Sequence, residues 1–145
     1  MSPTMINLLL KSLAETLYML SISAVLAAII GIPLGILLVV TEKNNILSCS
    51  MLNKPLSFLI NMVRSIPFII LMVAIIPLTR LVAGTSIGTT AAIVPLTLAA
   101  IPYTARMVET SIREIPSGLI EAAESMGATP IQITVSYTHL RAHET

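Results

Sequence analysis

The sequence predicts an all-α integral membrane protein, and three observations support this fold class. Hydrophobic residues make up 55% of the 145-residue chain and charged residues only 10%, whereas soluble domains carry roughly 25% charged residues. The apolar residues are concentrated in three segments long enough to cross a bilayer as helices. A polar segment rich in helix-forming residues follows the third of them. We therefore expect three transmembrane helices, at about residues 17–40, 56–79 and 87–105, and a further helix outside the lipid.

The first segment is the longest uncharged stretch, because residues 16–41 contain no charged side chain over a run of 26 residues. A tilted helix over residues 17–40 accounts for this length. Gly31 and Gly35 lie four residues apart within it. Small residues at this spacing let two helices approach closely, so we expect both glycines to pack against another helix. Only Lys11 precedes Glu15, and the apolar stretch is too long for a cleavable signal peptide.

The second segment follows a polar loop, residues 42–55, and contains Arg64 and two prolines, Pro67 and Pro77. We place Arg64 near the end of a span over residues 56–79, either extended toward the interface or buried in protein. The prolines are expected to kink or end the helix. In the connector that follows, Gly84 and Gly88 suit close helix packing or a tight turn.

The third segment, residues 87–105, contains Pro95 and Pro102 seven residues apart, a spacing that places both on one helix face. This predicts a bent helix, which is compatible with a helix beside a pore or with a kinked packing helix. Glu109 and Arg113 form a favourable i,i+4 pair, so we expect the helix to continue into water before Pro116.

The distribution of Lys and Arg predicts the orientation. With three spans, residues 42–55 and the segment after residue 105 share one side of the membrane. That side then holds most of the basic residues, namely Lys43, Lys54, Arg64, Arg106 and Arg113, and the other holds Lys11 and Arg80. The positive-inside rule makes the first side cytoplasmic and places the N-terminus outside.

The polar segment, residues 116–133, predicts two short helices joined by a glycine corner. Pro116 separates it from the third span, because proline lacks an N–H and disfavours helical backbone before it. Good helix formers follow, and Gly127 occupies the place where a helix end favours positive φ. Thr129 and Pro130 suit the N-cap and first position of the next helix.

This segment carries a family resemblance. Glu121-Ala122-Ala123, followed after three residues by Gly127, resembles the cytoplasmic "EAA" loop of importer permeases in the ATP-binding-cassette superfamily. Further stretches are similar to the methionine-uptake members of that superfamily, among them Arg64–Leu71, Ile76–Arg80, Ala105–Glu109 and Ile115–Ala122. The resemblance extends over about residues 1–133.

The resemblance implies a permease subunit of the bacterial inner membrane that forms the pore of an ATP-driven amino-acid importer, with methionine as substrate. It implies five spans per subunit, a second copy of the permease, a cytoplasmic ATPase and an extracytoplasmic binding protein. The residues implied in the ATPase contact are Glu121, Ala122, Ala123, Met126 and Gly127. Two alternatives remain open at this stage, a permease for another small polar substrate and a membrane scaffold without transport activity.

The resemblance stops after Ile133. The family continues with isoleucine, any residue, leucine and proline, where this chain has Tyr137, Thr138, His139 and Leu140. We interpret residues 134–145 as a non-native tail on a C-terminally truncated permease. His139 and His143 lack a third ligand, so we expect no metal site.

The composition excludes several other functions. The residues show no catalytic grouping and no cofactor site, so we expect a non-enzymatic subunit whose partner hydrolyses ATP. Lys and Arg do not cluster, which argues against nucleic acid as a partner. The single cysteine, Cys49, excludes an internal disulfide.

Overall fold

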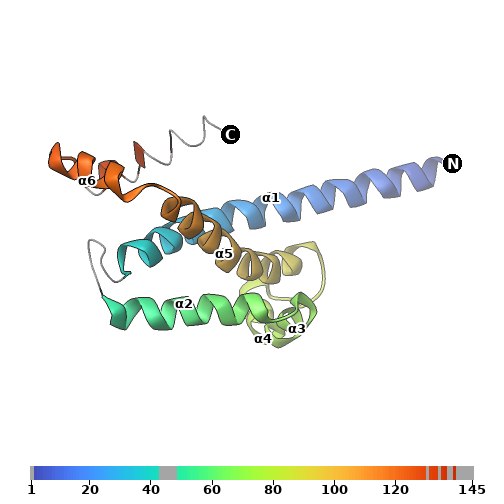
Figure 1. Cartoon of the computed structure of the whole chain (residues 1–145). Helices are drawn as coiled ribbons and strands as arrows, with labels where there is room; N and C mark the ends of the chain where they lie inside the picture. The colour runs from blue at the N-terminus through green and yellow to red at the C-terminus, as the bar shows by residue number, and fades with distance from the viewer. Residues whose placement is uncertain (1, 43–48, 130, 134, 137–138, 140–145) are drawn as a thin grey trace.

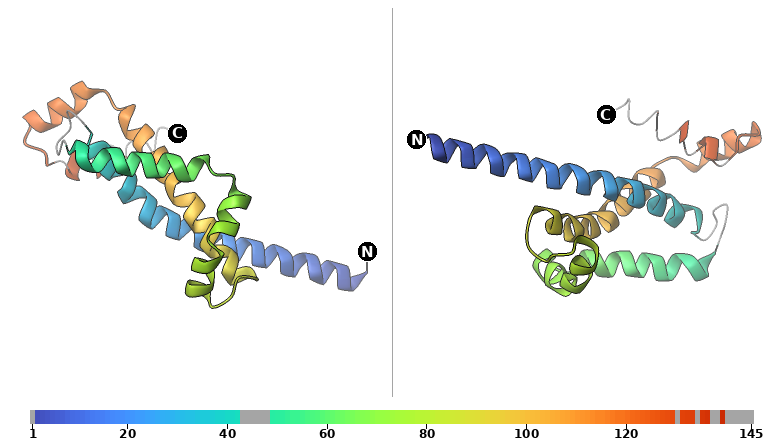
Figure 2. Two further views of the ribbon diagram at one scale, coloured as in Figure 1. Left: turned by 90° about the horizontal axis from the view of Figure 1, so that it is seen from below. Right: turned by 180° about the vertical axis from the view of Figure 1, so that it is seen from behind.

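The computed structural model of the chain describes residues 2–42, 49–129, 131–133, 135–136 and 139. The regular secondary structure of these residues is entirely helical, which confirms the predicted fold class (Figure 1). The elements in chain order are α1 (Pro3–Val40), α2 (Ser50–Ser65), α3 (Phe68–Ala74), α4 (Ile76–Ala83), α5 (Thr89–Arg113) and α6 (Ser117–Ser125). Figures 1 and 2 show α5 lying between α1 and α2, with α3 and α4 gathered near the beginning of α5.

Helices α1 and α5 are each long and apolar enough to cross a bilayer. Helix α1 begins at Pro3, so it contains the span predicted over about residues 17–40 and extends well before it. Proline is favoured at a first helical position, and the Lys11–Glu15 pair, at 4.0 Å, fits one helix face without interrupting it. Every described residue from 2 to 18 is exposed, and this part of α1 extends beyond the other helices (Figures 1 and 2).

The contact between α1 and α5 is made through small residues. The buried residues of α1 recur every three or four positions along one face, and they are Ser23, Ala27, Gly31, Gly35 and Leu38. A Cβ atom on Gly35 would lie 2.5 Å from the carbonyl oxygen of Ala105, and one on Gly31 would lie 2.8 Å from Cβ of Thr104. The two backbones can approach this closely because neither glycine has a side chain.

The second apolar segment, residues 56–79, is broken at its prolines, as the sequence predicts, and does not form one continuous helix. Helices α2 and α3 meet at a bend of 107°, and α4 follows as a separate short helix. The bend lies at Ile66 and Pro67, where Ile66 is extended (φ −80°, ψ 125°). Proline disfavours helical backbone in the residue before it and donates no hydrogen bond. If the bent pair counts as one span, the described chain has three.

The position of Arg64 differs from our expectation. Helix α2 begins at Ser50, so the predicted loop over residues 42–55 is too long, and Arg64 falls in the last turn of α2. Ten residues of α-helix separate it from Lys54, a rise of about 15 Å. The two side chains therefore lie toward opposite ends of α2, although the sequence analysis assigned both to one side of the membrane.

The connector before α5 contains Gly84 and Gly88, for which the sequence suggested either close helix packing or a tight turn. Gly84 ends α4 with φ 73°, and Gly88 precedes α5 with φ 117°. A Cβ atom at either position would meet no atom of the described chain within 4 Å. Within the described chain these glycines serve a tight turn, and no other helix packs against them there.

Helix α5 continues to Arg113, which confirms that it extends beyond the apolar segment, and it begins at Thr89, two residues after the predicted start. Pro95 and Pro102 are both buried, on the face that the seven-residue spacing predicts. The helix remains one element through both prolines.

Enlarging Gly35 tests the contact between α1 and α5. We expect Gly35→Leu to lower the free energy of unfolding by about 1–3 kcal/mol, because the new side chain meets the backbone of α5. Thermal unfolding in detergent micelles measures the change. Ala24→Leu is the control, since Ala24 lies exposed on the same helix. Equal melting temperatures for the two variants would contradict the proposed contact.

Candidate functional site

The polar segment after α5 forms the predicted helix and glycine corner. Helix α6 ends in a Schellman motif, in which two backbone N–H groups after the helix turn back to its last carbonyls. The N–H of Gly127 donates to the carbonyl oxygen of Glu124 at 2.9 Å, and that of Ala128 donates to Ala123 at 3.1 Å. Gly127 has φ 79°, a conformation that favours glycine. The corner predicted at Gly127 is confirmed.

The next helical turn begins with a reciprocal cap. The backbone N–H of Gln132 donates to Oγ1 of Thr129 at 3.4 Å, and the N–H of Thr129 donates to Oε1 of Gln132 at 3.0 Å. This is a capping box, which satisfies two backbone donors at a helix start. The N-cap predicted at Thr129 is confirmed, and residues 131–133 are helical. We did not predict the role of Gln132, although its position three residues after Thr129 is the sequence signature of this motif.

Most of the described side chains from Glu121 to Met126 are exposed to solvent or lipid. Helix α6 lies away from the α1–α5 pair, beyond the end of α5 (Figure 1). Glu121, Ala122 and Glu124 are exposed, Ala123 is half-buried, and Met126 is 81% exposed. The segment therefore presents two carboxylates, small side chains and the large apolar side chains of Leu119 and Met126 on and just after a short helix that ends in a Schellman motif.

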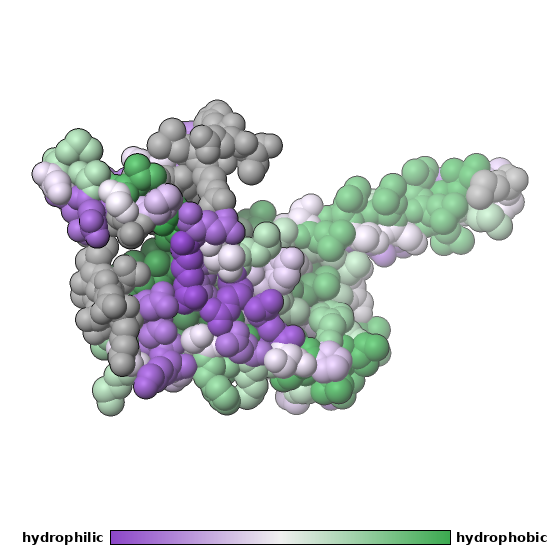
Figure 3. Space-filling view, in the orientation of Figure 1, coloured by the Kyte–Doolittle hydropathy of each residue, from purple (hydrophilic) through white to green (hydrophobic). Residues whose placement is uncertain are grey.

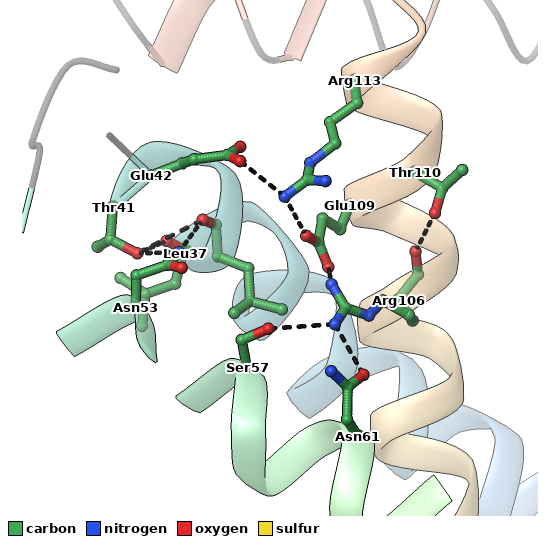
Figure 4. Close-up of polar contacts among 11 residues, drawn as sticks. Leu37, Thr41, Glu42, Asn53, Ser57, Asn61, Arg106, Glu109, Thr110 and Arg113 are labelled. Atoms are coloured by element: carbon green, nitrogen blue, oxygen red, sulfur yellow. Dashed lines mark hydrogen bonds and ion pairs between the residues drawn. The ribbon is translucent and has the colours of Figure 1, made fainter. Parts of the chain in front are cut away.

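A network of charged residues holds the end of α5 that leads into α6 (Figure 4). The side chain of Glu109 is only 3% exposed; it accepts a hydrogen bond from Arg106 and forms an ion pair with Arg113. The Arg113 contact, at 2.7 Å, is the i,i+4 pair predicted from the sequence. Arg113 also donates to Glu42, just beyond α1, at 3.0 Å. Removing one partner of a buried ion pair costs about 3–5 kcal/mol, so this network constrains the helix end strongly.

The same network reaches α2. One nitrogen of Arg106 donates to Oγ of Ser57 at 3.1 Å and to Oδ1 of Asn61 at 2.7 Å (Figure 4). Asn53 adds a second link, because its amide donates to the carbonyl oxygen of Leu38 in α1 at 2.6 Å. The sequence analysis did not identify these contacts of α2. The sequence feature that could have indicated these contacts is the recurrence of polar residues at intervals of three and four along an otherwise apolar segment.

The described residues contain no group of three His, Cys, Asp or Glu side chains that could hold a metal ion. Of the two histidines considered for such a role, His143 lies outside the described residues. Most of the predicted tail, residues 134–145, lies outside them as well. Cys49 is exposed and not part of a disulfide.

Comparison with known proteins places this arrangement among transport permeases. The chain is 54% identical over 127 residues to the probable D-methionine transport system permease protein MetI of Vibrio cholerae, a match that covers 88% of this chain. It is 52% identical over 133 residues to the D-methionine transport system permease protein MetI of Escherichia coli K12. The chain spans only 56% and 61% of the lengths of these two relatives.

A solved structure shares both sequence and fold with the chain. It is the MetNI methionine ABC transporter in an inward-facing conformation, with a TM-score of 0.88, 52% identity, and coverage of 92% of this chain and 62% of that one. The family model described as the binding-protein-dependent transport system inner membrane component matches residues 31–138. The chain therefore belongs to the family of inner membrane components of binding-protein-dependent transport systems.

Proposed function

We propose that this chain is part of the permease subunit of an ATP-driven methionine importer. The observation that carries the proposal is the exposed helix and glycine corner at residues 117–127, in a chain more than half identical to permeases named for D-methionine transport. The proposal refers to the whole permease, because this chain spans 56–61% of the length of those relatives. In the whole permease we expect five spans, a second copy of the subunit and an extracytoplasmic binding protein.

We assign the contact with the ATPase, through which ATP hydrolysis would act on the permease, to the segment around α6. We assign Glu121, Ala122, Ala123, Met126 and Gly127 to the surface that meets a cytoplasmic ATPase subunit. The small side chains let the partner approach the helix backbone, the carboxylates can pair with basic groups, and Met126 supplies an apolar contact. The ATPase subunit hydrolyses ATP, and the permease has no catalytic role.

The buried ion pairs explain how a movement of α6 would reach the pore. A short connector joins α6 to α5, and Glu109 fixes the end of α5 to Arg106 and Arg113. Arg113 links this helix end to Glu42, and Arg106 links it to α2. A displacement of α6 would therefore move three helices together rather than bend a single one.

The orientation follows from the end of the bundle at which basic residues gather. The Arg113–Glu42 contact brings the last turn of α5 to the end of α1, where Asn53 also anchors the beginning of α2. Lys54, Arg106 and Arg113 thus lie toward one end. By the positive-inside rule we assign this end to the cytoplasm and the N-terminus to the outside.

Replacing Gly127 tests the ATPase contact. We expect Gly127→Val, in a full-length permease that carries residues 1–133 of this chain, to reduce co-purification of the ATPase at least fivefold, since a β-branched residue is strained at φ 79°. Gly127→Asn is the matched control, because asparagine tolerates this conformation, and it should retain most of the association. Equal co-purification of both variants with the unsubstituted protein would argue against the corner as part of the contact.

Competition measurements test the substrate. Uptake of labelled methionine into proteoliposomes that contain the full-length permease, its ATPase and its binding protein should fall at least tenfold in excess unlabelled methionine. An amino acid of different side-chain chemistry, such as glutamate, should leave uptake unchanged. Lack of competition by methionine would show that the permease serves another small substrate.

Thiol labelling tests the orientation. A membrane-impermeant maleimide applied to intact cells should leave Cys49 unlabelled, although its side chain is exposed in the folded chain. Thr85→Cys, in a Cys49→Ser background, should react, because Thr85 is exposed in the connector at the other end. Permeabilised cells provide the control, in which both positions should be labelled. The reverse pattern in intact cells would invert the topology.

A further inference from the structure

Helix α2 carries a polar stripe along an otherwise apolar surface. Lys54, Ser57, Asn61, Arg64 and Ser65 follow one another at intervals that place them on one side of the helix. Large apolar side chains cover the opposite side, among them Leu52 and Leu59, which are 50% and 54% exposed. Figure 3 shows hydrophilic surface over α2 and the C-terminal half of α5. A helix of this kind inside a membrane turns its polar side to water or to protein.

Two residues of the stripe bind a side chain of α5, and Arg64, near the far end of the stripe, does not. Ser57 and Asn61 accept hydrogen bonds from Arg106. Arg64 lies about one turn beyond Asn61, in the last turn of α2, and its side chain is exposed. Among the residues that the structure describes, none forms a hydrogen bond or ion pair with the side chain of Arg64. Near the end of the stripe, the guanidinium group of Arg64 therefore has no polar partner within the described chain.

This guanidinium lies far from the end of α2 that is joined to α1. The contacts of Asn53 with Leu38 and Thr41 place the start of α2 at the end of α1, beside the charged residues that we assign to one membrane boundary. Arg64 is about 15 Å further along the helix axis than Lys54, which corresponds to roughly half the thickness of a 30 Å hydrocarbon core. An arginine at this depth requires water or an anionic partner.

The backbone next to Arg64 has the same requirement. The chain bends by 107° between α2 and α3, directly after Ser65, and Pro67 contributes no N–H. Irregular backbone at membrane depth is tolerated where protein or a water-filled cavity satisfies its free polar groups. The bend and the unpaired guanidinium thus indicate an aqueous path that begins along the stripe on α2 and reaches Arg64.

We infer that Arg64 binds the carboxylate of the transported amino acid midway through the membrane. This inference rests on the proposed import function, because a zwitterionic amino acid brings a carboxylate into the pore. The planar guanidinium can hold both carboxylate oxygens at once, a geometry that the ammonium of lysine cannot reproduce. Arg64 therefore acts as a transient binding group for the substrate within the pore.

Uptake and ATP hydrolysis measured together test this role. In proteoliposomes with the full-length permease, ATPase and binding protein, Arg64→Gln should reduce methionine uptake at least tenfold. The ATPase stimulation by loaded binding protein should stay within twofold, and Arg64→Lys should recover only part of the uptake. Arg80→Gln is the matched control, because Arg80 is an exposed arginine in the last turn of α4 and should leave uptake unchanged.

Three results would overturn the inference. Normal uptake with Arg64→Gln would show that the carboxylate does not depend on this residue. Parallel loss of uptake, ATPase stimulation and complex assembly would assign Arg64 to a structural ion pair with another part of the permease. Absence of methionine uptake with the unsubstituted permease would refute the proposed function and the site together. Failure of the site alone is distinguished by normal uptake in both the unsubstituted permease and Arg64→Gln.

Water access provides a readout that does not depend on transport. In a Cys49→Ser background, Arg64→Cys should react with a small charged thiol reagent, because the proposed aqueous path reaches this position. Leu59→Cys should not react, because it lies on the apolar side of the same helix. Equal, low reactivity at both positions would exclude an aqueous path to Arg64.

Discussion

The carboxylate of Glu109 is buried where α1, α2 and α5 come together, and a charge in this position is tolerated only when it is paired. Two arginines from its own helix meet this requirement, and each reaches onward to another part of the chain. The pairing of one charge therefore joins three helices at one end of the bundle. Helix α6, which follows α5 at this end, is therefore attached to a part of the bundle that these ion pairs hold in place.

The rest of the bundle depends on the close approach of α1 to α5. Gly31 and Gly35 allow backbone contact between these helices, which leaves little room for sliding or rotation. The region of α2, α3 and α4 is built differently, because prolines interrupt it and its helices are short. The structure thus combines a tightly packed helix pair with a broken segment beside it.

The corner at Gly127 could be predicted because all of its interactions are local. Its positive φ, the two hydrogen bonds of the Schellman motif and the cap at Thr129 join residues no more than five apart. The same holds for the Glu109–Arg113 pair. The contacts of Arg106 could not be predicted in this way. Ser57 and Asn61 are 49 and 45 residues away in sequence, and only the packing of α2 against α5 brings them within reach.

Composition and periodicity alone determined the all-helical membrane class, the extension of the third helix to Arg113, and the helix and corner that we assign to the ATPase contact. The tertiary structure decided how sharply the second apolar segment bends, how far α1 extends beyond its neighbours, and that Arg64 and Lys54 lie toward opposite ends of α2. The physical reason is the reach of the forces involved. Hydrophobicity and local hydrogen bonds are encoded within a few residues, whereas the depth of a charge in the membrane depends on how whole helices pack.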